Sequence, residues 1–305
     1  MIAAKIIEDS INTVTGDRIT TFLWLYPRMI HSEIMTHRKF SRNAASSRAI
    51  PIEKVMKEVL ERPARPVFWG ANQKGMVADV ELPTKAAAEA IRLWDEAGRA
   101  AVEQARKFQS IITDEGTFSV HKQIVNRIME PWAHMLTLVT ATEYTNFFAL
   151  RVEPNAQPEF QCLATKTLQL YLTSTPRPLN AGDWHTPFGD MASDSPDALK
   201  FTDMKLKIAT GRAARTSYKT IEGSVDVVKD MDLHDRLIAN HHMSPTEHCA
   251  KAMAAPGQSG NFSGWEQYRK MIPNENIKDV DLWDRLASAK KFNYDDNLNN
   301  VWPSN

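Results

Sequence analysis

The chain has 305 residues, of which 43% are hydrophobic and 24% are charged, and its formal net charge is zero. This length is enough for one large domain or two ordinary ones, and the composition is typical of a globular protein. A neutral balance excludes a global attraction to nucleic acid or anionic lipid, so any anion must be bound by a few placed donors. No apolar run is long enough to span a bilayer. We therefore expect neither a nucleic-acid polymer nor a membrane as a partner.

The N-terminus and the cysteine content both predict a cytoplasmic protein. Residues 1–9 become acidic too soon for a signal peptide and are better explained as a first strand. Cys162 and Cys249 are too few for a disulfide framework, which is typical of a reducing compartment. Each cysteine is expected to be a small buried hydrophobic residue.

Strands and helices are both predicted along the chain. Residues 13–26 alternate polar and apolar side chains, which predicts a strand, and Pro27 ends it and can open a helix. The stretch from 83 to 108, rich in Ala, Glu, Lys and Arg, predicts an amphipathic helix. Further helices are expected at 122–129, 140–152, 159–173 and 233–240, and a strand is expected at 206–210. Prolines and glycines between 174 and 198 predict a loop.

The densest group of chemically useful side chains lies between Met35 and Arg48. These fourteen residues include three arginines, a lysine, a histidine and five hydroxyl or amide groups. Guanidinium groups together with hydroxyl and amide donors are suited to holding phosphate. A solvated basic helix end is the alternative. The clustering of Ser41, Asn43, Ser46 and Arg48 favours a phosphate site.

Other segments carry further candidates. Arg151 lies at the exit of the helix predicted up to 152, and Arg127 precedes a helix-ending proline. Four histidines between 234 and 248 suggest zinc, but Pro245 interrupts the helix that such a site needs, so no metal is expected. No glycine-rich dinucleotide-binding or P-loop pattern occurs, which argues against a Rossmann domain.

Together these segments resemble the signature blocks of the flavin-dependent thymidylate synthases. Thr36-His37-Arg38, seven residues, Ser46 and then Arg48 are similar to the family's Arg-His-Arg block, with Thr36 in place of the first arginine. Ala149-Leu150-Arg151, followed by Asn155 and Ala156-Gln157, is similar to its Asn-Leu-Arg block. Residues 213–218 and 242–248 are similar to its Ala-Arg-x-Ser-Tyr and His-x-Ser-Pro-x-Glu-His blocks. Three further positions differ, because Ala149 replaces the asparagine of the Asn-Leu-Arg block, Ala49 replaces a tyrosine and the pair Phe160-Gln161 lacks an arginine.

The blocks stand in a different order from that of the family, in which the last two come first. The resemblance therefore implies a circularly permuted or duplicated chain, which is physically reasonable when termini lie close together. Residues 1–175 form one expected half, 176–200 a linker or insertion, and 201–305 the other half. Residues Trp265–Glu275 repeat features of the first block. They are either a degenerate second copy or a surface helix anchored by Trp265 and Tyr268.

The resemblance implies an α+β fold of the flavin-dependent thymidylate synthase type, with a central antiparallel sheet, long helices and FAD held between the subunits of a homotetramer. It implies transfer of a one-carbon unit from methylenetetrahydrofolate to C5 of dUMP, with NADPH as the reductant. The implied flavin contacts are His37, Arg38, Arg151, Asn155, His242 and Ser244. The implied nucleotide contacts are Glu33, Thr36, Ser46, Arg48 and Arg127, with Ser46 and Arg48 as catalytic residues. The alternatives are a pyrimidine nucleotide hydroxymethylase acting on dUMP or dCMP, and a non-catalytic nucleotide- or flavin-binding protein.

Overall fold

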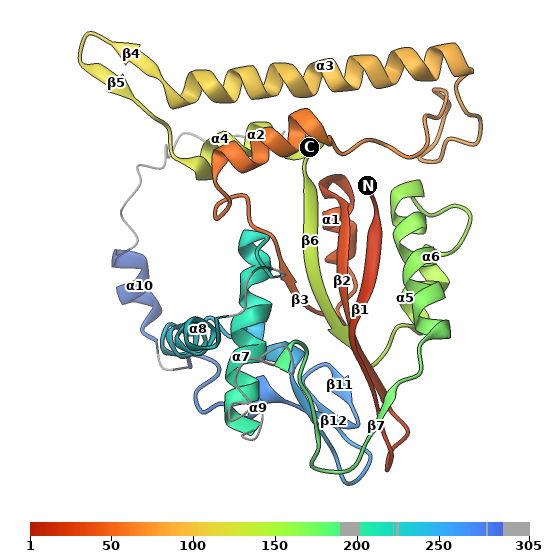
Figure 1. Cartoon of the computed structure of the whole chain (residues 1–305), viewed down its shortest axis with the longest axis vertical. Helices are drawn as coiled ribbons and strands as arrows, with labels where there is room; N and C mark the ends of the chain where they lie inside the picture. Colours follow the sequence, from red (N-terminus) through yellow and green to blue (C-terminus); the bar gives the residue numbers. More distant parts are fainter. Residues whose placement is uncertain (190–201, 222, 224–225, 279, 289–305) are drawn as a thin grey trace.

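A five-stranded sheet with the strand order β3-β6-β2-β1-β7 lies at the centre of the computed structural model (Figure 1). The model describes residues 1–189, 202–221, 223, 226–278 and 280–288. The strands are β1 (Ala3–Asn12), β2 (Arg18–Pro27), β3 (Ser41–Ala44), β6 (His134–Ala141) and β7 (Arg177–Leu179). Neighbouring strands are antiparallel except for β1 and β7, which are parallel. The architecture is thus the expected mixture of helices and a largely antiparallel sheet.

One face of the sheet carries an aromatic core. Phe22, Trp24 and Tyr26 alternate along β2 and pack with Phe147 and Phe160. Strand side chains point alternately to the two faces, so this spacing sends all three residues of β2 to the same side. The elements that cover this face are η1 (Arg28–Ile30), α1 (His31–Ile34), α5 (Thr145–Arg151) and α6 (Pro158–Thr173).

The other face is covered by the C-terminal part of the chain, which we call the C-terminal layer. Leu23 and Leu138 pack there against Ala213 and Ile221. A small sheet in the order β12-β9-β8 lies in the same layer. The layer consists of β8 (Trp184–His185), α7 (Thr202–Ala214), η5 (Arg215–Tyr218), α8 (Val227–Ala239), η6 (Ser244–His248), β9 (Ala250–Ala252), β10 (Gln258–Ser259), β11 (Phe262–Ser263), β12 (Trp265–Gln267), α9 (Tyr268–Met271) and α10 (Leu282–Ser288).

A helical unit sits at one end of the sheet, and its long helix α3 crosses the top of the view in Figure 1. Its core includes Val55, Val102 and Val125, one from each of three helices. The unit consists of α2 (Ile52–Glu61), α3 (Thr84–Gln109), the hairpin β4 (Ile111–Thr113) and β5 (Gly116–Phe118), α4 (Lys122–Ile128) and η2 (Glu130–Trp132). None of the described helices is both long enough and apolar enough to cross a membrane.

The predicted helices at 83–108, 122–129, 159–173 and 233–240 are confirmed as α3, α4, α6 and part of α8. The strand predicted at 206–210 is wrong, because these residues belong to α7. This helix is buried on most sides, so its apolar run does not show the helical period that a half-exposed helix shows.

The helix predicted at 140–152 is also wrong at its start. Residues up to Ala141 complete strand β6, and the helix begins only at Thr145. β6 is buried on both faces and therefore lacks the alternation that identifies a half-exposed strand. The loop predicted at 174–198 contains the strands β7 and β8, while residues 190–198 lie outside the described residues. The division into halves at 175 and 200 stays a prediction.

Candidate functional site

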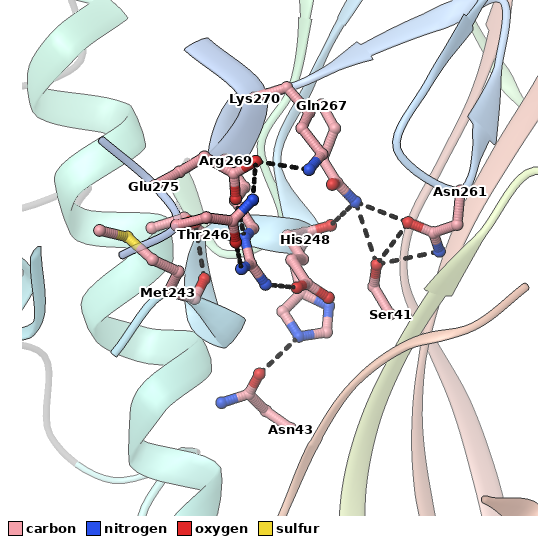
Figure 2. Close-up of polar contacts among 12 residues, drawn as sticks. Ser41, Asn43, Met243, Thr246, His248, Asn261, Gln267, Arg269, Lys270 and Glu275 are labelled. Atoms are coloured by element: carbon pink, nitrogen blue, oxygen red, sulfur yellow. Dashed lines mark hydrogen bonds and ion pairs between the residues drawn. The ribbon is translucent and has the colours of Figure 1, made fainter. Parts of the chain in front are cut away.

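The first signature block and the last one meet at strand β3. Ser41 and Asn43 point from β3 toward the C-terminal layer, because they pair with Thr140 and Leu138, which lie on that face of β6. Ser41 lies against two amides of that layer (Figure 2): Asn261 Nδ2 is 3.1 Å and Gln267 Nε2 is 3.2 Å from its Oγ. Ser41 is 1% exposed and Asn43 is 7% exposed. Both residues therefore connect two layers of the protein and do not serve as the surface phosphate donors that their clustering suggested.

The Asn43 amide joins three parts of the molecule. It lies 3.1 Å from His248 Nε2 (Figure 2). The backbone oxygens of Arg42 and Ser244 are also 3.1 Å away, and both can only accept. Figure 2 draws Oδ1 of Asn43 toward His248, but an oxygen on this side makes no bond to either carbonyl, so the amide nitrogen is assigned to this side. In this orientation the predicted site residue Ser244 is tied to the strand that carries the first block.

The loop that carries Ser46 and Arg48 is held by neighbouring backbone and side chains. The Ser46 amide donates to Ser217 O of η5 at 3.0 Å. From the other side, Asn126 Nδ2 donates to Ser47 O at 2.7 Å and to Ile50 O at 2.9 Å. The loop backbone is thus fixed by α4 and η5, whereas the Arg48 side chain is exposed.

A second meeting point joins the first block to the Asn-Leu-Arg-like block. Arg151 at the end of α5 donates from Nε to His37 Nε2 at 3.1 Å and forms an ion pair with Glu33 at 3.0 Å. Its guanidinium carbon also lies 4.5 Å from the centre of the Phe160 ring. Burial lowers the pKa of His37 to about 4, and the charges of Arg151 and Arg42 act in the same direction. His37 is therefore neutral at physiological pH and accepts from Arg151.

A cavity of about 310 Å³ opens beside this meeting point. It is lined by residues 36–40 together with α5 side chains that include Asn146, Leu150 and Arg151. Arg38 and Lys39 are exposed at its edge. Within the described residues, neither cation makes an ion pair or a side-chain hydrogen bond. The cavity therefore combines aromatic walls with two cations available to an anion.

Several predicted residues lie apart from these meeting points. Asn155 is exposed and bonds only to Glu153. Arg127 is exposed on α4, and its Nε donates to Gln123 O of the same helix at 3.2 Å. His242 is exposed after the end of α8. Thr36 is exposed, and its hydroxyl is turned back to Glu33 O at 2.6 Å.

Sequence patterns gave no indication of one group of buried residues, namely Thr21, Thr140 and His185. They also gave no indication that His248 bonds to Thr140 of this group. Threonines in strands and single histidines carry no spacing signal, so only their contacts reveal them. Among the described residues, no group of three or more His, Cys, Asp or Glu side chains is arranged to hold a metal ion.

The donor set fits the phosphate-bearing part of a flavin or nucleotide. Two cations without a partner in the described part of the chain flank an aromatic cavity, which is the combination that recognises a phosphate attached to a ring. Its volume of about 310 Å³ is at the lower end of ligand pockets, so the cavity has room for one phosphate or ring portion of such a ligand and not for a whole dinucleotide.

Comparisons with known proteins found no family model and no curated protein that matches the chain. Two solved structures of PolB from Streptomyces cacaoi, a UMP/dUMP methylase, are similar to part of it. They contain 5-Br UMP and 5-Br dUMP respectively. Each is 15% identical with a TM-score of 0.42, and the match covers 56% of this chain and 89% or 90% of PolB. Similarity at this level carries no argument about function, which rests here on the site itself.

Proposed function

We propose that the protein is a flavin-dependent enzyme that transfers a one-carbon unit from methylenetetrahydrofolate to C5 of dUMP and yields dTMP. The observation that supports this proposal most is the convergence of separate signature blocks on β3 and its flanking loops. Asn43 contacts Ser244, Ser46 contacts Ser217, and His37 contacts Arg151, although these partners lie more than 100 positions apart.

The residues around the cavity have distinct roles in this proposal. Arg38 and Lys39 supply charge for a phosphate group, and Arg151 and His37 hold the cavity wall in place. Asn155, His242 and Ser244 are assigned to the flavin from the resemblance alone. The other parts of FAD would lie against a second copy of the chain in a homotetramer, since the cavity is too small for the whole group.

The nucleotide is assigned to the loop of Ser46 and Arg48, with Glu33, Thr36 and Arg127 as further contacts. C5 of a pyrimidine becomes nucleophilic only when electron density is drawn onto the ring, and a placed cation stabilises that charge. Arg48 is suited to this role because its backbone is fixed while its side chain is exposed and unpaired among the described residues. FAD, when bound and reduced by NADPH, supplies hydride.

One observation favours a hydroxymethylase as the second candidate. At the position where the family has an arginine, Phe160 is completely buried and Gln161 donates to Glu153 O at 2.9 Å. A cation that would act on the pyrimidine is therefore absent from these two positions. With weaker charge stabilisation, water could resolve the one-carbon adduct on dUMP or dCMP, and the product would carry a hydroxymethyl group.

Purified full-length protein tests both candidates. A bound flavin spectrum that bleaches with NADPH, together with methylenetetrahydrofolate-dependent gain of a methyl group by dUMP, is the expected result. Gain of a hydroxymethyl group would replace the first candidate by the second. A protein that takes up no FAD and leaves dUMP and dCMP unchanged would contradict both, and binding of either ligand without turnover would identify a non-catalytic binding protein.

A further inference from the structure

A row of buried polar side chains crosses the sheet behind the candidate site. Thr21 of β2 is directly paired with Thr140 of β6, and Thr140 is paired in turn with Ser41 of β3. His185 from β8 and His248 from the end of η6 lie against this row. All five side chains are at most 1% exposed. Polar groups buried to this degree persist only if they are hydrogen-bonded.

Thr21, Thr140, His185 and His248 form, together with Ser10 and Asn43, a continuous set of hydrogen bonds, which we call the cross-sheet network. The bonds join Ser10 Oγ to His185 Nδ1 (3.0 Å), His185 Nε2 to Thr21 Oγ1 (2.8 Å), Thr21 Oγ1 to Thr140 Oγ1 (2.7 Å), Thr140 Oγ1 to His248 Nδ1 (2.8 Å) and His248 Nε2 to the Asn43 amide (3.1 Å). The network therefore extends from β1, across β2 and β6, to β3.

Both histidines of the network are neutral. Burial lowers the pKa of His185 to about 3, and the charge of Arg177 adds to this effect. Burial likewise lowers the pKa of His248 to about 3. A neutral imidazole donates through one nitrogen and accepts through the other, and a hydroxyl has a single proton to donate. The direction of one bond therefore determines the direction of all the others.

The Asn43 amide sets this direction at one end. Once the Asn43 nitrogen, and not the Oδ1 drawn in Figure 2, lies toward His248, its two hydrogens are shared among three acceptors: the Arg42 carbonyl, the Ser244 carbonyl and His248 Nε2. An amide nitrogen cannot accept a hydrogen bond, so His248 Nε2 carries no proton and the proton of His248 lies on Nδ1. Thr140 then accepts from His248 and donates to Thr21, which donates to His185 Nε2. The proton of His185 consequently lies on Nδ1.

The other end of the network favours the same direction. Oε1 of Glu8 lies 3.8 Å from His185 Nδ1, and its negative charge favours a proton on that nitrogen. Two independent features, an amide at one end and a carboxylate at the other, thus favour the same tautomers.

We propose that Asn43 and His248 are positioning residues for the ligand site, and that the cross-sheet network holds the Asn43 amide in one orientation. That orientation joins the backbone of Arg42, in the first signature block, to the backbone of Ser244, in the last. If the amide rotated, its oxygen would face two carbonyl oxygens and both contacts would be lost. The proposal rests on the proposed function only for the identity of the ligand.

Nitrogen NMR of histidine-labelled protein tests the direction of the network without any ligand. At neutral pH we expect His248 and His185 to be neutral and protonated on Nδ1. Protonation of either on Nε2, or averaging between the two tautomers, would overturn the proposal.

Thr140→Val tests the link between the network and the ligand, with Thr137→Val as the matched control. Both threonines are completely buried in β6, but Thr137 lies on the opposite face and bonds to Tyr26 Oη at 2.6 Å. Thr140→Val removes the acceptor of His248, so we expect tautomer averaging at His248 and a rise in the Kd for FAD of roughly two- to tenfold. Thr137→Val should change neither quantity. Equal effects of the two variants would contradict the positioning role.

The NMR measurement and the FAD-binding measurement separate this proposal from the proposed function. If the wild-type protein binds no FAD, the proposed function fails, and the Thr140→Val comparison is then read from the His248 tautomer alone. If FAD binds but His248 is protonated on Nε2, the cross-sheet network fails while the proposed function stands.

Discussion

Two regions with similar residue types use their cations in opposite ways. In the block from Thr36 to Arg48, three of the four Lys and Arg side chains, Arg38, Lys39 and Arg48, are exposed and unpaired among the described residues. The fourth, Arg42, is half-buried and donates to backbone oxygens of residues 34, 35 and 37. In the segment from Trp265 to Glu275, both cations are neutralised.

In that second segment Arg269 pairs with Glu247 and Glu275 and donates to Asn276 Oδ1 at 3.0 Å, and Lys270 pairs with Glu275 at 2.6 Å (Figure 2). Trp265 is completely buried, and its Nε1 donates to Asp17 O. Cations of this kind stabilise the fold and leave no charge for a ligand. The difference teaches that the partners of a cation, and not its residue type, determine whether its charge stays available to a ligand.

A fall in pH should have the largest effect, because it should destabilise the first region and leave the ion pairs of the second intact. The first region contains His37 and contacts His248 through Asn43, and the cross-sheet network connects His248 to His185. Burial lowers the pKa values of His37, His185 and His248 to about 4, 3 and 3. In the unfolded chain these histidines have the ordinary histidine pKa of about 6.5. As the pH falls below that value the unfolded state takes up protons that the folded state does not, so the folded state loses stability. The loss should approach about 4 kcal/mol per pH unit for the three together.

Urea unfolding between neutral and mildly acidic pH measures this slope. The ion pairs of Glu275 with Arg269 and Lys270 should persist over that range, because these cations lower the pKa of Glu275. A free energy of unfolding that does not change with pH over this range would show that the histidines are protonated in the folded state.

Removal of the Arg48 charge should have the largest effect on turnover. Arg48→Gln removes a cation proposed to stabilise charge on the pyrimidine, and loss of one such donor lowers kcat by roughly 10²–10³. Because Arg48 is exposed, the free energy of unfolding should change by less than about 0.5 kcal/mol. Steady-state kinetics and urea unfolding measure the two quantities. Arg99→Gln, at an exposed position on α3, is the matched control and should alter neither.

Arg269→Gln should show the reverse pattern. It leaves Glu247 and Glu275 without their common partner, and we expect a loss of about 1–3 kcal/mol in the free energy of unfolding. Because Arg269 is already paired, FAD affinity should stay within roughly threefold of the wild-type value, a change that corresponds to less than 1 kcal/mol. Stability like that of the wild type combined with lost FAD binding would mean that the second segment is a functional copy.

Arg38→Gln and Lys39→Gln should have the smallest effects. Each removes one exposed charge beside the cavity, and such charges typically contribute about 0.2–1 kcal/mol. FAD titrations at low and high salt should show a weaker salt dependence for each variant than for the wild type. Lys85→Gln, at an exposed position on α3, serves as the control. An unchanged salt dependence would remove this edge of the cavity from the proposed phosphate site.

The sequence by itself determined the elements with a clear period. It predicted a first strand at residues 1–9 and a helix at 83–108, which are found as β1 and α3. The strand predicted at 13–26 is found as β2 from residue 18 onward, because residues 13–17 belong to the connection between β1 and β2. It also singled out the segments that meet at β3. It failed at α7 and β6, because elements buried on most sides show no alternation between polar and apolar residues.

Only the tertiary structure decided which side chains become partners. Ser41 and Asn43 carry the same donors as Ser46, yet β3 places them against the C-terminal layer and buries them. The pairing of Arg269 with Glu247, and of His248 with Thr140, depends on residues 22 and 108 positions away. Hydrogen bonds and ion pairs act over a few ångströms in space, so their partners cannot be deduced from positions along one chain.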